Sequence, residues 1–516
     1  ENTDTIWMFN PHCRYEKQNS YGNPDIGVLP KRKVSTIVFG DGFDSIPAFI
    51  CQGARNLKNI VFPEGVKYMG RMCFAGANLD TIAIPNSVEV VDTSAFQSAT
   101  IKHLVFPEGV KKIGIWCCLS AAIEKIDLPS TLSEIGHIAF GECRELKEIT
   151  IPANNKRYIS INGALYTKNI DTLIVYPAQH LTVTIPNTVK YIGTYALSYT
   201  RATKIHIPSN VEGMAGNPFR GSTTIKEFTI DFNNSNYIVL NGVLYEKYSS
   251  WYKTGKIRLK AYPLAKEDSI YIMPQNVASM EERALILNHF KYIELSPKLE
   301  GIYELYSEDK DLIQTIVVPC VTPPRLYGTK VWTTLEPRIK VPCNTTDAYL
   351  TNSEWQTINS YEEKAFVYVE CDTTCGRVSV NNRIVTCGDS VTISAEPKDD
   401  YLFVKWDDGS TSPTRVVEAK GVDIYTALFR KVKYSGFCGA EDDGTNLQWS
   451  LNIEDSILII TGHGRMRDFD VNNRAPWYQL RLAINAISLS EQLTHLGGEA
   501  FRGCSNLKSI IFFSYK

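Results

Sequence analysis

The chain has 516 residues, of which 44% are hydrophobic and 21% charged, and its formal net charge is −2. This composition excludes bulk disorder, and the near-neutral charge excludes a nucleic-acid binder, which needs a concentrated basic face. No apolar run reaches the roughly 18 residues of a membrane-spanning helix. The length exceeds the usual size of one compact domain, but an array of stacked repeats grows along one axis without that limit.

A proline recurs every 22 or 23 residues through the first third of the chain. Each one directly follows an apolar triplet spaced Φ-x-x-Φ-x-Φ, such as Ile123/Ile126/Leu128. The triplet predicts a short parallel strand that ends at the proline, because proline cannot donate to the strand ladder. Self-similarity at this period predicts a stacked-repeat solenoid. The recurring prolines are Pro63, Pro85, Pro107, Pro129 and Pro152.

The same register predicts about thirteen rungs between residues 30 and 345. One rung cannot cover its own apolar faces, so neighbouring rungs must stack on it. A glycine often follows the middle apolar position of a unit, and we expect a tight bend with positive φ there. These glycines are Gly70, Gly114, Gly136 and Gly193.

Two related inserts interrupt the array, at about residues 153–180 and 231–268. Each contains an Asn-Gly pair between alternating apolar residues, Asn162-Gly163 and Asn241-Gly242, which predicts a hairpin. The second insert also carries an aromatic cluster, which we propose as a candidate partner-binding edge because Tyr and Trp give large contact areas. The alternative is that these rings pack the insert against the solenoid. The cluster is Tyr245, Tyr248, Trp251 and Tyr252.

The register stops near residue 348, where Asp347–Ile358 is predicted to cap the array. Residues 363–432 alternate in the period of a strand and predict a small all-β domain. Residues 433–516 predict a second cap followed by the first rungs of another array, with Ile484/Ile487/Leu489 in register. The predicted organisation is therefore an N-terminal cap segment at 1–40, a solenoid at 41–362, and these two further parts.

The unit L-x-x-I-x-I-P-x-x-V-x-x-I-G-x-x-A-F-x-x-C is clearest between Ile123 and Pro152. It resembles the leucine-rich repeat of BspA-like surface proteins, as found in Bacteroidetes. Residues 365–430, with Trp406 and Asp408-Gly409, are similar to the internalin B-repeat. The resemblance implies a β-rich, right-handed leucine-rich repeat solenoid with short parallel strands and few helical turns, plus the small all-β domain and a second, truncated repeat segment.

The resemblance also implies location at the cell exterior or on the outer-membrane surface. Relatives of this type include adhesins for host proteins and other bacteria, and a lipid anchor upstream of Glu1 is one form of attachment. No signal peptide is visible at the start of this sequence, so we expect that any export signal has been removed.

The 13 cysteines fall into two groups. Six occupy apolar core positions of their repeats, where a buried thiol behaves as a small hydrophobic group. Cys320 and Cys343 instead follow the prolines of successive late rungs, so a disulfide between them and two free thiols are both open. The core group is Cys51, Cys73, Cys117, Cys118, Cys143 and Cys504.

No motif for catalysis, a metal or a cofactor is present. The eight histidines lack paired ligand spacing, and neither a G-x-S-x-G sequence nor a glycine-rich phosphate loop occurs. The leading hypothesis is a non-enzymatic adhesin-type protein that binds a host or bacterial surface protein, or a polysaccharide, through the solenoid face and inserts. The alternatives are a carbohydrate-binding or architectural component of a surface assembly, and an enzyme whose site forms from distant residues.

Overall fold

The computed structural model describes residues 5–8, 34–79, 81–247, 255–285, 290–303, 313–327, 338–356, 358, 360–398, 401–431, 434–453 and 455–513. These residues form two compact units, Glu1–Lys364 and Ala365–Lys516. The first unit is a solenoid of short parallel strands, which confirms the predicted leucine-rich repeat fold. The predicted scarcity of helix also holds in the described ranges, which contain one α-helix, α1 (Thr346–Thr351).

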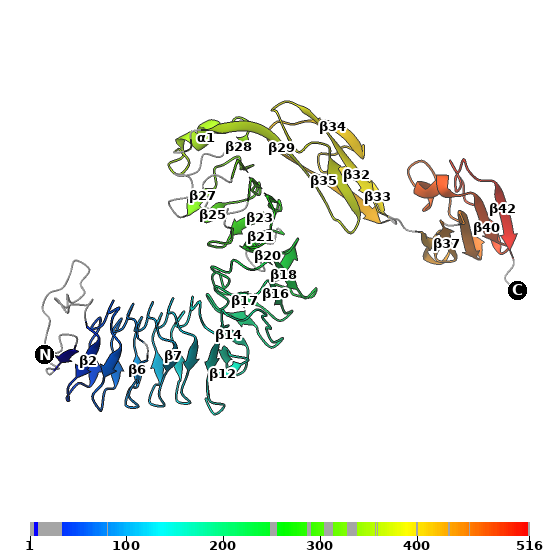
Figure 1. The fold of residues 1–516 in the computed structure, drawn as a ribbon. Helices are drawn as coiled ribbons and strands as arrows, with labels where there is room; N and C mark the ends of the chain where they lie inside the picture. Colours follow the sequence, from blue (N-terminus) through cyan, green and yellow to red (C-terminus); the bar gives the residue numbers. More distant parts are fainter. Residues whose placement is uncertain are drawn as a thin grey trace. The chain divides into compact units, whose positions relative to one another are not determined.

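The first array is a row of rungs that lie side by side in chain order from β2 to β12 (Figure 1). Each rung passes through a first strand column, a proline, a second strand column and a turn. Neighbouring strands within a column pair in parallel. The first strand column contains β1 (Thr5–Met8), β2 (Thr36–Phe39), β4 (Asn59–Val61), β7 (His103–Val105), β9 (Lys125–Asp127) and β11 (Glu148–Thr150). The second strand column contains β3 (Ser45–Ile46), β5 (Tyr68–Met69), β6 (Val90–Val91), β8 (Lys112–Ile113) and β10 (Glu134–Ile135).

The apolar triplets form one continuous core along this array. Leu104, Ile126 and Ile149, the middle residues of three triplets, are fully buried and stack from rung to rung. Phe74 and Phe96 stack in the same way, with ring centroids 5.7 Å apart. The rung at 78–86 contributes the buried Ile82 and Ile84, although its described residues form no strand.

The glycines after the second strand column are needed for a reason other than the predicted one. Gly70, Gly114, Gly136 and Gly193 do not adopt positive φ. A Cβ atom on Gly136 would lie 2.3 Å from the Ile115 nitrogen and 2.4 Å from the Gly114 carbonyl carbon. At Gly70, Gly114 and Gly136 the backbone of the preceding rung therefore occupies the space that a side chain would need, whereas at Gly193 the nearest atom, the Leu173 carbonyl oxygen, lies 3.1 Å away.

An antiparallel hairpin forms at each Asn-Gly pair. Asn162, Gly163, Asn241 and Gly242 all have φ between 50° and 79°, as a two-residue hairpin turn requires. The third strand of each insert then pairs in parallel with the next rung, so each insert stands in for a rung of the second strand column. The first insert has β12 (Tyr158–Ile161), β13 (Ala164–Thr167) and β14 (Thr172–Val175), followed by β15 (Tyr191–Ile192) and β17 (Gly213–Met214). The second has β19 (Tyr237–Leu240), β20 (Val243–Lys247) and β21 (Ile257–Ala261), followed by β23 (Val277–Met280).

The later rungs continue both strand columns and end at a cap. The first strand column resumes with β16 (Lys204–Ile207) and β18 (Glu227–Ile230), and then with β22 (Ile270–Ile272), β24 (Tyr292–Glu294), β26 (Thr315–Val317) and β28 (Arg338–Pro342). Two further strands of these rungs, β25 (Gly301–Tyr303) and β27 (Arg325–Tyr327), pair with each other in parallel. Tyr349 of α1 and Trp355, which follows the helix, are fully buried and close the core of these rungs.

The second unit contains two groups of strands. Strand β29 (Tyr361–Cys371) begins beside β28 and continues beside β35 (Val422–Lys431). The other strands of this group are β30 (Gly376–Val380), β31 (Ile384–Val385), β32 (Ser390–Pro397), β33 (Tyr401–Trp406) and β34 (Thr414–Glu418). The last group is β36 (Ser435–Phe437), β37 (Leu447–Asn452), β38 (Ile457–Gly462), β39 (Gly464–Arg465), β40 (Ala486–Ser490), β41 (Leu493–His495) and β42 (Ser509–Phe513). In the part of the chain that the structure describes, no helix has both the length and the apolar character needed to cross a membrane.

Candidate functional site

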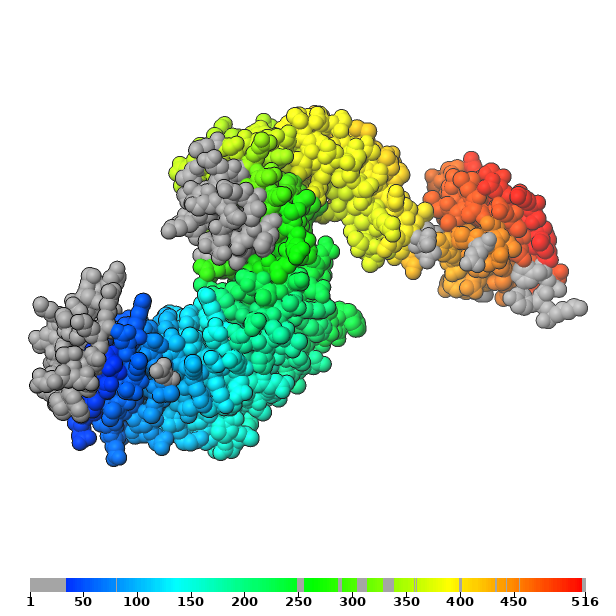
Figure 2. Space-filling model, viewed as in Figure 1, coloured from blue at the N-terminus to red at the C-terminus, as the bar shows by residue number. Residues whose placement is uncertain are grey.

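The outward side of the first strand column exposes aliphatic side chains in consecutive rungs. Val61 is 50% exposed and Val105 is 43% exposed, and Ala83 is exposed in the rung between them. A groove of about 450 Å³ runs over three rungs at the ends of these strands. Its lining includes Ala83, Val105, Asp127 and the prolines Pro107 and Pro129. Figure 2 shows this array in space-filling form, coloured from blue to cyan.

Charged and polar side chains on the same strands pair between rungs. His103 Nε2 lies 2.6 Å from Asp127 Oδ2, and Lys125 Nζ lies 2.8 Å from Glu148 Oε1. The Thr150 hydroxyl donates to the other oxygen of Asp127. Partial burial would raise the pKa of the Asp127 carboxyl, but the hydrogen bonds from Thr150 and His103 outweigh it, and the pKa lies below its usual value. A charged Asp127 therefore stands beside the aliphatic groove.

One set of side chains has the order of groups found in a catalytic triad. His206 Nδ1 lies 3.1 Å from Thr229 Oγ1, and His206 Nε2 lies 3.1 Å from Asp231 Oδ1. His206 lies on β16, Thr229 on β18 and Asp231 directly after β18, at exposed or half-buried positions. Asp231 also accepts a hydrogen bond from the Ser209 N–H. Because this set repeats the inter-rung pairing of His103 with Asp127, stacking of the rungs explains it without catalysis.

The outward residues of the later rungs are not exposed as their sequence positions suggest. Glu294 is 1% exposed and Val317 is fully buried. These two residues therefore do not belong to a partner-facing surface, whereas Ile270 and Ile272 of β22, at the start of the later rungs, are exposed.

Neither alternative left open for Cys320 and Cys343, a disulfide between them or two free thiols, is correct. Cys320 carries a free, buried thiol, and its Sγ donates to the Ser296 carbonyl oxygen at 3.3 Å. Cys343 is disulfide-bonded, and so is Cys387. Sequence spacing suggested Cys320 as a disulfide partner because it lies one rung before Cys343. Its side chain instead packs in the core of its rung.

The other described repeat cysteines are free thiols as well. Burial raises the pKa of the Cys143 and Cys320 thiols to about 12. At pH 8 only about one such thiol in ten thousand is ionised, and the thiolate is the reactive form. We expect iodoacetamide to leave Cys143 and Cys320 unlabelled in the native protein.

Mass spectrometry of alkylated peptides checks this prediction. After unfolding without reductant, Cys143 and Cys320 become labelled, while Cys343 and Cys387 require a reductant first. Labelling of Cys343 in unfolded, unreduced protein would contradict the disulfide, and rapid native labelling of Cys320 would contradict its burial.

Comparison with known proteins identifies the repeats. The family described as the BspA type leucine-rich repeat region matches this chain in six copies, over residues 44–162, 116–238 and 477–515. These repeats are BspA-type leucine-rich repeats. The strand columns continue to β28, beyond the matched residues, so the leucine-rich repeat solenoid is longer than the segments that match the family.

Several solved structures are similar to this chain. A leucine-rich repeat protein from Eubacterium ventriosum is 19% identical, with 66% of this chain and 80% of that chain covered and a TM-score of 0.44. A leucine-rich cell surface protein from Faecalibacterium prausnitzii is 17% identical, with 65% and 91% covered and a TM-score of 0.41. A leucine-rich repeat protein from Bacteroides ovatus is 16% identical, with 69% and 92% covered and a TM-score of 0.35. No curated protein matches the chain.

The proposed aromatic edge of the second insert is only partly described. Tyr245 is 1% exposed in the core of the BspA-type solenoid, and its hydroxyl lies 3.0 Å from that of Tyr271. Its proposed contact with a partner is therefore wrong, because the ring packs in a core cluster that includes Val243 and Tyr271. Tyr248, Trp251 and Tyr252 lie outside the described residues.

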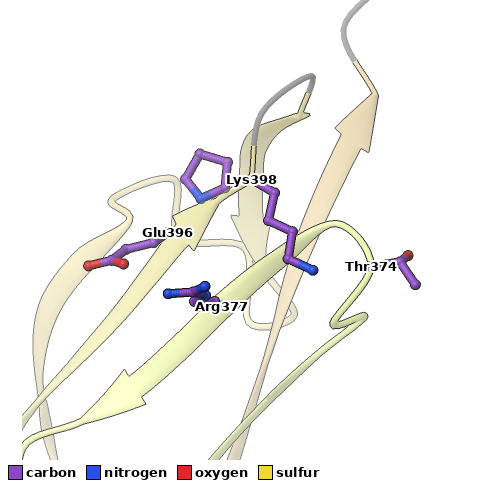
Figure 3. A pocket seen from close by; sticks show the side chains of 5 residues that line it. Thr374, Arg377, Glu396 and Lys398 are labelled. Carbon is purple, nitrogen blue, oxygen red and sulfur yellow. The ribbon is translucent and has the colours of Figure 1, made fainter.

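A recess of about 450 Å³ lies at one end of the β30–β32 pair in the second unit. Its lining is polar, with Thr374, Arg377, Glu396 and Lys398 around it (Figure 3). The Lys398 ammonium donates to the Thr373 carbonyl oxygen at 2.6 Å. Within the described residues, no group of three or more His, Cys, Asp or Glu side chains could hold a metal ion here or elsewhere.

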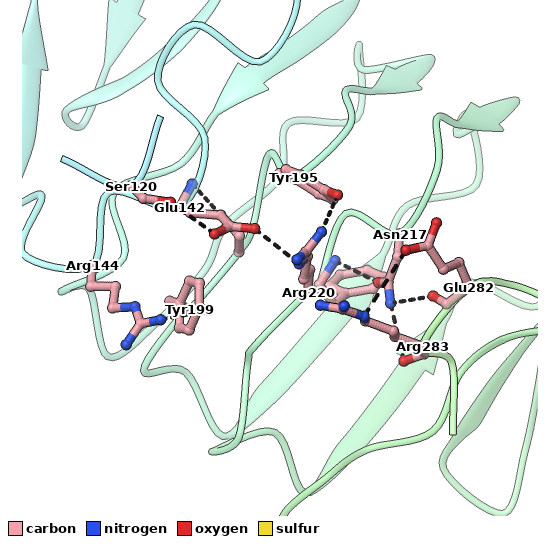
Figure 4. Close-up of polar contacts among 11 residues, drawn as sticks. Ser120, Glu142, Arg144, Tyr195, Tyr199, Asn217, Arg220, Glu282 and Arg283 are labelled. Atoms are coloured by element: carbon pink, nitrogen blue, oxygen red, sulfur yellow. Dashed lines mark hydrogen bonds and ion pairs between the residues drawn. The ribbon is translucent and has the colours of Figure 1, made fainter. Parts of the chain in front are cut away.

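The turns of the BspA-type rungs carry a polar network that the sequence analysis did not find (Figure 4). Glu142 Oε1 lies 2.9 Å from Arg220 Nε, and the Ser120 hydroxyl donates to its other oxygen at 3.0 Å. The Arg220 guanidinium lies 5.0 Å from the ring centroid of Tyr195, and that of Arg144 lies 4.0 Å from that of Tyr199. The sequence could have indicated these turn side chains, because Tyr195 and Tyr199 occupy the same turn positions as Trp116 and Ser120 in a regular rung. The first insert lies between Glu142 and Arg220 in the sequence, so the repeat spacing does not reveal that these two residues pair.

Proposed function

We propose that this chain is a non-enzymatic adhesin-type protein, secreted or exposed at a cell surface, that binds a protein or glycan partner through its BspA-type solenoid. The groove over three rungs of the first strand column carries the proposal, because it combines exposed aliphatic side chains with a rigid hydrogen-bonded sheet. Protein interfaces bind most strongly at such apolar centres with a polar rim. Here the rim is formed by Asp127 and Glu108.

A protein partner fits this groove better than a glycan. Sugar rings are commonly held by stacking on aromatic rings, whereas the exposed outward residues Val61, Ala83 and Val105 are aliphatic. The partner class follows the leading hypothesis from sequence, a host or bacterial surface protein. A carbohydrate-binding or architectural role is the alternative outcome.

The disulfide chemistry supports a location outside the cytosol. Cys343 and Cys387 are disulfide-bonded, and structural disulfides persist chiefly in oxidising compartments. The free thiols of the solenoid, such as Cys73 and Cys117, are fully buried and protected from oxidants in such a compartment. In this proposal residues 363–432 act as a B-repeat-like spacer.

A binding screen with matched variants tests the proposal. The recombinant chain is immobilised and exposed to matrix proteins, bacterial surface proteins and polysaccharides. We expect protein hits whose affinity falls about tenfold or more in the double variant Ala83→Lys/Val105→Lys, because two charges enter the apolar centre of the groove. The new lysine at 105 would lie beside Asp127, so the fold should tolerate it.

The control is Val416→Lys, which changes an exposed valine of β34 in the second unit and is expected to leave binding unchanged. If protein binding is unchanged in the double variant, the groove is not the binding site. Glycan hits alone would favour the alternative, and turnover of a substrate would overturn a non-enzymatic role. Replacing Tyr248, Trp251 and Tyr252 with alanine tests the remaining candidate edge in the same assay.

A further inference from the structure

The turns of the first array form a third ladder of hydrogen bonds between rungs, here called the turn ladder. In a regular rung, the Trp116 N–H donates to the His137 carbonyl at 3.1 Å, and the Cys118 N–H donates to the Ala139 carbonyl at 2.7 Å. The donors are two residues apart, and so are the acceptors. Each turn therefore offers its successor N–H groups at alternate residues, the spacing of an extended peptide. The third of them, the Ser120 N–H, donates to the Gly141 carbonyl at 3.0 Å, and the corresponding Glu142 N–H donates to the Ser198 hydroxyl at 3.0 Å.

The first insert interrupts the turn ladder. The insert supplies strand β14 but no full turn after it. The chain leaves at Tyr176, whose N–H donates to the Ala196 carbonyl at 2.7 Å. The Ile138 and Phe140 N–H groups should reach the next turn, yet they have no hydrogen-bond partner among the described residues. The carbonyl oxygen of Thr194, on the far side of the interruption, also has none within those residues.

A cavity of about 240 Å³ occupies this interruption, which we call the first junction. Residues 135–141, including Ile138, line one wall, and Gly193 and Thr194 line the other. Ile174 of β14 contributes to the lining between them. The first junction thus combines unpaired donors, an unpaired acceptor and an aliphatic surface.

The second insert creates a corresponding junction, where a side chain bridges the gap, although the Asn217 N–H, like that of Ile138, has no partner among the described residues. Its return residue Tyr262 donates to the Ala284 carbonyl at 2.8 Å, as Tyr176 does to Ala196. Asn217 Oδ1 accepts from the Phe219 N–H at 3.0 Å, and Asn217 Nδ2 donates to the Glu282 carbonyl at 3.1 Å. Figure 4 shows this amide between the two sides of the second junction.

An ion pair also fills the second junction. Lys260 is 1% exposed, and its ammonium donates to Glu281 Oε2 at 2.8 Å and to the Met214 carbonyl at 2.9 Å. Strand pairing places Lys260 where the first junction has Ile174, and Glu281 where it has Gly193. The position of Asn217 is that of Ile138. The first junction therefore lacks every side chain that closes the second.

Ile138 keeps the backbone conformation of the regular rungs. Its φ is 54°, and the residues at the same turn position of other rungs, Met72, Ser94, Trp116 and Tyr195, have φ between 53° and 60°. The first junction therefore presents its N–H groups in the same geometry with which a regular turn binds its successor.

We propose that the first junction binds an extended peptide segment of a partner protein, whose backbone takes the place of the missing turn. Two of its carbonyl oxygens accept from Ile138 and Phe140, and one of its N–H groups donates to Thr194. A peptide is the occupant because in each regular rung the same donors bind carbonyls two residues apart in one chain. The aliphatic lining selects small apolar side chains. None of these residues lines the groove of the first strand column, so this site is independent of the proposed function.

Amide NMR on the full chain tests the site directly. The protein is deuterated and carries ¹⁵N-labelled isoleucine and phenylalanine, and the probe is the peptide acetyl-Ala-Val-Ala-Val-amide. We expect the Ile138 and Phe140 amide signals to shift saturably, with a midpoint of about 1 mM, because both N–H groups gain acceptors. Phe219 is the internal control, since Asn217 already pairs its N–H.

Two matched changes make the test decisive. The double variant Ile174→Lys/Gly193→Glu installs the ion pair of the second junction and is expected to abolish the shift of Phe140. On the unmodified protein, the same peptide with N-methylated backbone amides is expected to bind at least about fivefold more weakly, because it cannot donate to Thr194. No shift at about 10 mM peptide, equal shifts in the double variant, or equal binding of the methylated peptide would each overturn the proposal.

Discussion

Replacing Gly136 with alanine is expected to lower the free energy of unfolding by about 3 kcal/mol. The new Cβ atom would lie 2.3 Å from the Ile115 nitrogen, and backbone cannot rotate away as a side chain can. The Gly136 N–H also donates to the Ile113 carbonyl at 2.8 Å, which holds the two rungs at this separation. The rungs must therefore part or the hydrogen bond must break.

Denaturant unfolding combined with hydrogen exchange measures this effect, because a solenoid can open locally rather than all at once. We expect faster exchange in the rungs around Gly136. The control is Gly421→Ala, since Gly421 has no atom within 4 Å of its Cβ position and no positive φ. Its effect is expected to stay within about 0.5 kcal/mol. Equal stability of the two variants would contradict the close-approach explanation.

Replacing Trp355 with alanine is expected to cost about 3–5 kcal/mol, mainly in the rungs before the cap. Trp355 is fully buried, and its ring centroid lies 5.2 Å from that of Tyr349 in an edge-to-face contact. Its indole N–H donates to the Pro324 carbonyl at 2.8 Å. The substitution leaves a large cavity and an unpaired carbonyl where the solenoid must hide its last apolar surface.

The variant Trp355→Phe separates packing from hydrogen bonding, because it keeps most of the ring and removes the N–H. We expect it to cost about 1–2 kcal/mol, clearly less than the alanine variant. Hydrogen exchange of β26 and β28 reports the local effect, and the first array serves as the internal reference. A loss of exchange protection that is as large in the first array as in β26 and β28, or that is absent from β26 and β28, would be inconsistent with a capping role.

The rungs, the hairpins and the cap follow from local chemistry in the sequence. Proline ends a strand wherever it stands, and an Asn-Gly pair favours positive φ in any two-residue hairpin. The buried Tyr349 and Trp355 of the cap could be predicted because an array needs apolar residues to close its core. Each of these inferences depends on a residue and its immediate neighbours.

Contacts between rungs required the tertiary structure. The spacing of Cys320 and Cys343 suggested a pair, but which thiol enters the core depends on how each rung turns. Gly136 suggested a bend, whereas the approach of another rung is what excludes a side chain. Tyr245 suggested a surface because it neighbours loop-like residues, yet β20 turns it inward.

The sequence alone determined that this chain contains a leucine-rich repeat solenoid interrupted by two hairpins, because a 22-residue repeat imposes the same local geometry on every unit. Only the tertiary structure decided that the two interruptions differ. The Asn217 side chain bridges the second junction and pairs the Phe219 N–H, while the corresponding Phe140 N–H at the first has no partner among the described residues. The physical reason is that a backbone group finds its partner in the next rung, and an insert moves that partner to a distance in sequence that no local pattern encodes.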